Sequence, residues 1–147
     1  MASAAARALE RSLTERGHAV TTFRATVPRT VADMNRPESR GTPWRDEIDK
    51  TAPDIFLDVH SFPGNGLDVY LLSLLDPLPW HVAMARALAA VSRAGIRQGS
   101  LVNDIMKRAS ERRIPSVLIE FSEGLDELKL KEICDAIAKF VSHMEKM

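Results

Sequence analysis

The sequence has little of three features that often identify a class of protein directly: cysteine, net charge and long apolar segments. Cys134 is the single cysteine among 147 residues, so no disulfide forms within the chain and a reducing, cytoplasmic location is expected. Twenty basic residues balance twenty acidic ones, which argues against a nucleic-acid partner. The longest apolar segment, around residues 67–75, is interrupted by Asp68 and Ser73 and is too short to span a membrane, so no membrane partner is expected.

What remains is an ordinary globular composition, with 45% apolar and 27% charged residues. The length suits one compact domain, and no linker, repeat or low-complexity segment divides residues 1–147. Charge is uneven: residues 1–45 hold eight arginines against four acidic residues, a net charge of about +4 that would attract a small anionic molecule. For Arg7, Arg11 and Arg16 a solvated helix face is the simpler explanation.

Helix and strand patterns alternate along the chain, which is typical of an α/β sandwich. The patterns predict helices over residues 1–16, 44–51, 77–94 and 101–113 and a closing amphipathic helix over about 130–144. They predict strands over residues 19–25, 29–33, 54–60, 67–75 and 115–121, a loop over 35–43 and a short link over 97–100. Gly17 and Gly95 are expected to end the first and third helices. The predicted fold is a single three-layer α/β domain, in which a mostly parallel mixed sheet carries helices on both faces.

Two ionisable residues interrupt strands that otherwise look like core. His60 lies at the carboxyl end of the apolar strand over 55–59, and in open α/β sheets that end faces the ligand crevice. A histidine bonded to a neighbouring carbonyl is the structural alternative. Glu120 lies in the apolar strand over 115–121, where burial of an unpaired carboxylate costs several kcal/mol. Glu120 therefore needs an arginine partner, a metal, or a catalytic role such as a general base with a pKa raised by burial.

A third polar site is the pair Asn35 and Arg36, which follows a predicted strand and precedes Pro37. The guanidinium fork of Arg36 and the amide of Asn35 are groups that bind a carboxylate. Ordinary loop polarity is the alternative interpretation.

Taken in order, these sites resemble the zinc carboxypeptidase-like superfamily. The matching features are Asn35-Arg36, the strand ending Asp58-Val59-His60-Ser61, Gly99-Ser100 before a helix, and the strand carrying Glu120. The segments ADMNRPESR and LDVHSFPG look most like the N-formylglutamate amidohydrolase branch, and the likeness covers about residues 25–125.

The resemblance implies a carboxypeptidase-like fold and a metal-dependent hydrolase that cleaves an amide bond next to a free carboxylate. The substrate would be a small anionic or peptidic molecule. The resemblance assigns His60 to a zinc ion, Glu120 to general base catalysis, Asn35 and Arg36 to the substrate carboxylate, and Ser100 to the specificity loop. Arg40 is a further candidate for substrate binding beside Arg36.

The family's other two zinc ligands come from a His-x-x-Glu or Pro-His-Ser-Gly motif that has no counterpart upstream of His60. His18 lacks a glutamate three residues further on. The missing ligands would then come from a segment before Met1 or from another chain, or the protein is a catalytically degenerate relative that serves as a binding or assembly module. In the last case we expect the exposed sheet edge to pair with a second copy or with a strand of another protein.

Overall fold

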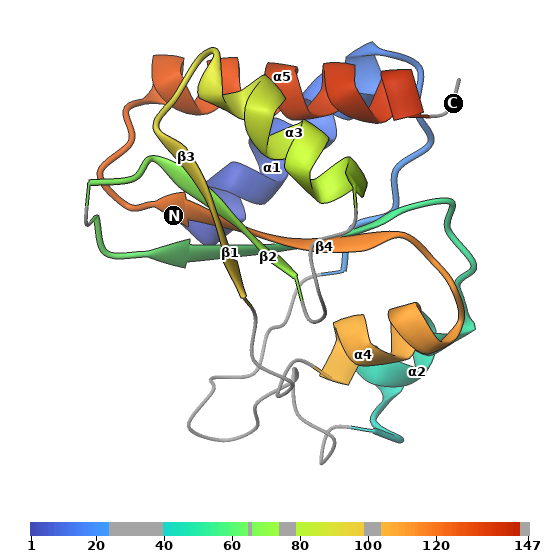
Figure 1. The fold of residues 1–147 in the computed structure, drawn as a ribbon. Coiled ribbons are helices and arrows are strands. Elements are labelled where there is room, and N and C mark those ends of the chain that lie inside the picture. Colours follow the sequence, from blue (N-terminus) through green and yellow to red (C-terminus); the bar gives the residue numbers. More distant parts are fainter. Residues whose placement is uncertain (24–39, 65, 74–78, 99–103, 145–147) are drawn as a thin grey trace.

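The computed structural model describes residues 1–23, 40–64, 66–73, 79–98 and 104–144. These residues form a single α/β domain with one four-stranded mixed sheet. The elements, in chain order, are α1 (Ala2–Glu15), α2 (Pro43–Lys50), β1 (Phe56–Phe62), β2 (Val69–Ser73), α3 (Pro79–Ala89), β3 (Ala94–Gln98), α4 (Asp104–Glu111), β4 (Ser116–Ser122) and α5 (Glu127–Met144). Helices α1, α3 and α5 lie on one side of the sheet and α2 and α4 on the other (Figure 1), so the prediction of helices on both faces is confirmed.

The strand order is β1-β4-β2-β3, and the sheet contains both kinds of pairing. Strand β1 pairs parallel with β4, and β2 pairs parallel with β3. The two pairs are joined by antiparallel pairing between β2 and β4. The sheet is therefore mixed, as predicted, and the last strand in the chain lies inside it, between β1 and β2.

The main core lies between the sheet and the helices α1, α3 and α5. Because side chains alternate along a strand, every second residue of β4 faces this core: Val117, Ile119 and Phe121 are fully buried there. The helices bury the apolar positions predicted from their spacing, which include Ala5, Leu9 and Leu13 of α1 and Leu130, Ile133, Ile137, Phe140 and Val141 of α5. Cys134 is fully buried in the same core, and this burial raises the pKa of its thiol to about 12. In the described part of the chain, no helix combines the length and apolar character of a membrane span.

Several predictions were wrong in the segments between the correctly predicted helices and strands. Helix α3 ends at Ala89, and Gly95, expected to end that helix, lies within β3. The predicted link over 97–100 begins inside the same strand, since β3 continues to Gln98. Residues 19–23 form no strand, and the rest of that prediction, with the strand over 29–33, lies outside the described residues. The residues of β3 have low intrinsic strand propensity, and they form a strand because they pair with β2.

The end of α4 contains a residue in a conformation that favours glycine. Arg113 has φ 59°, in the left-handed region, where side chains other than glycine are strained. The N–H of Ile114 donates to the carbonyl of Ala109 at 3.0 Å, and that of Arg113 donates to the carbonyl of Ser110 at 3.0 Å. These bonds satisfy carbonyls at the helix end, so the strained conformation is retained for capping.

We expect Arg113→Gly to stabilise the protein by about 0.5–1 kcal/mol, because glycine adopts this φ without steric cost. The free energy of unfolding from urea titration measures the effect. Lys107→Gly is the matched control: Lys107 is exposed within the same helix, and glycine there should destabilise by about 1 kcal/mol. A loss of stability in both variants would contradict the capping argument.

Candidate functional site

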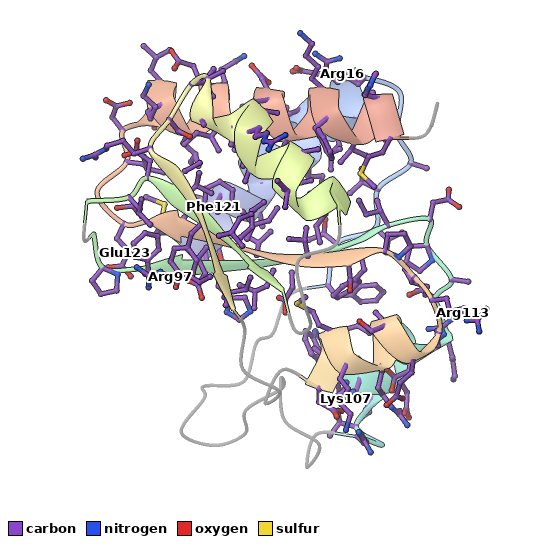
Figure 2. The ribbon with its side chains drawn as sticks, viewed as in Figure 1. Arg16, Arg97, Lys107, Arg113, Phe121 and Glu123 are labelled. Atoms are coloured by element: carbon purple, nitrogen blue, oxygen red, sulfur yellow. The ribbon has the colours of Figure 1, made fainter. Side chains whose placement is uncertain are left out.

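The two residues on which the predicted site depends, His60 and Glu120, are neighbours in the structure. They are register partners in the parallel pairing of β1 with β4. Both face away from the main core, because Val59 and Ile119, the residues before them, belong to the core face. Figure 2 shows the two faces through labelled residues: Phe121 points toward the α5 side of the sheet, and Arg97 lies on the opposite side. An imidazole and a carboxylate far apart in sequence thus share one face, near the carboxyl ends of their strands.

Asp58 holds the ring of His60. The Nε2 atom of His60 lies 2.9 Å from Oδ1 of Asp58, two residues earlier on the same face of β1. The two side chains are partly buried, with 22% and 14% of their surface exposed. A carboxylate on one ring nitrogen fixes the orientation and tautomer of an imidazole and makes the other nitrogen more basic. His60 is therefore oriented as a metal-binding or proton-transferring histidine would be.

Aromatic and cationic groups from β2 and β3 extend this face beyond Glu120. Tyr70 of β2 is the antiparallel partner of Glu120, and its ring packs against Phe62 with centroids 4.8 Å apart. The guanidinium of Arg97, from β3, lies 4.3 Å from the centre of the Tyr70 ring. Burial raises the pKa of Tyr70, the negative charge of Glu120 raises it further, and Arg97 opposes both effects. We call Asp58, His60, Glu120, Tyr70 and Arg97 the polar face of the sheet.

The predicted substrate-binding residues do not all fall within the described part of the chain. Asn35, Arg36 and Ser100 lie outside it. Arg40 is described, and it binds Asp104 at the start of α4: Nε donates to Oδ2 at 2.8 Å, and Nη2 donates to Oδ1. For Arg40 to bind a substrate, this bidentate pair would have to open.

Asp104 is the centre of a buried ion-pair network that joins α2 to α4. Arg45 of α2 is fully buried and donates to Oδ2 of Asp104 at 2.9 Å. The hydrogen bonds from Arg40, opposed by burial and reinforced by Arg45, lower the pKa of Asp104 to about 2. Asp49 adds a weaker contact to Arg45 at 3.7 Å and pairs with Arg108 at 3.1 Å. Sequence reasoning missed this network because Asp104 looks like an ordinary acidic residue in the first turn of a helix, as Asp46 and Glu127 also do.

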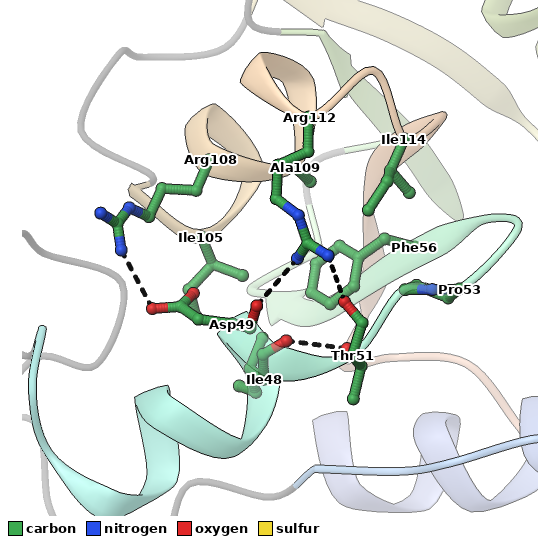
Figure 3. A pocket seen from close by; sticks show the side chains of 10 residues that line it. All are labelled: Ile48, Asp49, Thr51, Pro53, Phe56, Ile105, Arg108, Ala109, Arg112 and Ile114. Carbon is green, nitrogen blue, oxygen red and sulfur yellow. Dashed lines mark hydrogen bonds and ion pairs between the residues drawn. The ribbon is translucent and has the colours of Figure 1, made fainter.

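A small pocket lies between α2 and α4, away from the polar face (Figure 3). Its wall includes Arg112, which donates to the backbone carbonyls of Asp49 at 3.0 Å and Thr51 at 2.6 Å. Phe56 of β1 also lines it, with Ile48, Pro53, Ile105, Arg108, Ala109 and Ile114. None of the predicted site residues is among its lining residues, so this pocket belongs to the packing of α2 and α4 against the start of β1.

The donor atoms on the polar face satisfy a zinc site only in part. Catalytic zinc takes three protein ligands and one open position. Within the described ranges, no group of three or more histidine, cysteine, aspartate or glutamate side chains is arranged to hold a metal ion. The described residues thus offer one oriented imidazole, His60, and an adjacent carboxylate, Glu120.

Comparison with known proteins found no matching family model, no similar curated protein and no similar solved structure.

We expect Asp104→Asn to destabilise the protein by about 3 kcal/mol, because it removes a negative charge that lies 2.9 Å from the buried guanidinium of Arg45. Asp135→Asn is the control: Asp135 pairs with Lys131 in an exposed ion pair, and the amide oxygen of asparagine can still accept the hydrogen bond that Ser12 donates to Asp135. Loss of this ion pair should cost less than about 1 kcal/mol. Urea unfolding at pH 7 measures both, and equal effects would contradict the argument.

The ion pairs of Asp104 make the stability of the protein depend on pH. Folding lowers the pKa of Asp104 from 3.8 to about 2. The ionised Asp104 therefore adds its full contribution to the free energy of unfolding above pH 4, and this contribution is lost as pH falls toward 2. Unfolding titrations between these values should show this loss in the wild type and a smaller one in Asp104→Asn.

Proposed function

We propose that this protein is a metal-dependent hydrolase that cleaves an amide bond next to a free carboxylate. The observation that carries the proposal is the register pairing of His60 with Glu120 on one face of the sheet, with Asp58 on the His60 ring. The order of the sequence motifs supports the same reaction. The alternative is a catalytically degenerate relative that keeps these residues and binds without hydrolysis.

Four residues of the polar face, Asp58, His60, Glu120 and Tyr70, have roles that fit their surroundings. Asp58 orients the imidazole of His60 through Nε2, as a carboxylate orients a metal-binding histidine. Glu120, at the neighbouring register position, accepts a proton from the attacking water and later delivers it to the leaving amine. Tyr70 and Phe62 form an apolar wall beside Glu120 that limits access of bulk water.

The zinc ion belongs to the proposal through the chemistry of the donors. His60 would be one ligand, and further ligands would have to come from outside the described residues. When bound, zinc would polarise the amide carbonyl and lower the pKa of a bound water to about 7.

The proposal is tested by hydrolysis of N-formyl- and N-acetyl-amino acids with the full chain, with and without added zinc, measured as release of the free amino group. We expect zinc-dependent turnover, and Glu120→Gln should lower kcat by about 10²–10⁴ because it removes the general base. Glu123→Gln is the matched control, since Glu123 is an exposed glutamate just after the same strand. Absence of turnover in the wild type, or equal rates in Glu120→Gln, would reject hydrolysis and leave the degenerate relative.

A second variant tests the role of Asp58. Asp58→Asn should weaken zinc affinity about 10–100-fold, because the ring of His60 loses its orienting carboxylate. Competition with a chromophoric chelator measures the affinity, and Asp54→Asn, an exposed aspartate before β1, is the control. Unchanged affinity in Asp58→Asn would contradict a metal-binding role for His60.

A further inference from the structure

Arg97 is a cation on the polar face to which neither the sequence motifs nor the resemblance assigns a role. It lies on β3, is exposed, and packs its guanidinium 4.3 Å from the centre of the Tyr70 ring. Contact with an aromatic ring holds a guanidinium in place, and a guanidinium carries five N–H groups in a planar fork. Such a fork binds a carboxylate with two hydrogen bonds.

The position of Arg97 brings this fork close to Glu120. In the register of the sheet, Arg97 pairs with Leu72, and Leu72 pairs with Leu118, two residues before Glu120. The side chain of Arg97 reaches from that level to the ring of Tyr70, whose backbone is the direct partner of Glu120. Neighbouring strands lie about 5 Å apart, so the guanidinium lies over the strand beside the catalytic carboxylate. In the proposed substrate, the free carboxylate is a few bonds from the scissile carbonyl. The carboxylate can therefore reach Arg97 while the amide lies at Glu120.

Three arginines of α2 and of the segments before α2 and β3 are already engaged with acidic residues. Arg40 and Arg45 bind Asp104, and Arg93 binds Asp68 at 2.9 Å. Among the described residues, Arg97 takes part in no ion pair, and its contact is with an aromatic ring. Arg97 is therefore the described arginine that both lies on the polar face and can receive an anion without breaking an existing pair.

The geometry points to Arg97 as the residue that binds the free carboxylate of the substrate, with Tyr70 as the platform that holds the guanidinium in place. This inference rests on the proposed amide hydrolysis and deepens it. It places the carboxylate of the substrate on the β2–β3 side of Glu120, with the amide above the His60–Glu120 pair. Arg97 thus selects acids over neutral amides of the same shape.

The test compares N-acyl amino acids with their neutral C-terminal amides as substrates of the full chain. Arg97→Met should raise KM for the acids about tenfold or more, with little change in kcat, because a charge-assisted pair to the carboxylate is lost. KM for the neutral amides should not change. Arg97→Lys, which keeps the charge and loses the fork, should give an intermediate KM.

Arg93→Met is the matched control, since Arg93 is an exposed arginine just before the same strand and is paired with Asp68. Its KM for the acids should equal that of the wild type. Arg36→Met is the competing variant: if it raises KM for the acids and Arg97→Met does not, the role of Arg97 is overturned and the hydrolase proposal stands.

If the wild type hydrolyses none of these compounds, the proposed function fails and Arg97 is judged by binding alone. N-acetylglycine is then titrated into the wild type, Arg97→Met and Arg93→Met and followed by isothermal calorimetry. Binding that is lost only in Arg97→Met supports the carboxylate site. Equal binding in all three proteins, or binding in none, overturns it.

Discussion

The parallel pairing of β1 with β4 is the constraint on which the candidate site depends. Its register makes His60 and Glu120 direct neighbours, although 60 positions separate them in the sequence. The apolar residues of β4 fix that register, because Val117, Ile119 and Phe121 must face the core under α1 and α5. A slip of one residue would turn Glu120 into this core and expose the apolar set. The energy that folds the domain therefore also assembles the polar face.

The second helical layer has a different physical basis. Helices α2 and α4 are held together by ion pairs. Arg45 of α2 and Arg40, just before α2, both donate hydrogen bonds to the carboxylate of Asp104 in α4. This layer lies beneath the starts of β1 and β4, where Phe56 meets it, while His60 and Glu120 lie toward the carboxyl ends of the same strands (Figure 1). Arg40 was expected to bind substrate, but in the structure it binds Asp104 and so joins the segment before α2 to α4.

Local patterns predicted well the elements whose signal is contained in their own residues. The strands over 54–60 and 115–121 are apolar and β-branched, and the structure forms β1 and β4 within two residues of those bounds. The closing helix follows from an apolar residue every three or four positions. Strand β3 could not be found in this way, because Ala94, Gly95 and Gln98 favour no strand by themselves. Arg97 was missed with it, since a residue in a presumed link has no defined face.

By itself, the sequence determined that an imidazole and a carboxylate interrupt two apolar strands, since the need of His60 and Glu120 for polar surroundings is a property of each residue in its own strand. Only the tertiary structure decided which side chains meet: Asp58 on His60, Arg97 on Tyr70, and Asp104 between two arginines. The physical reason is that side-chain alternation is local, whereas strand order and helix docking follow from the burial of apolar surface contributed by the whole chain.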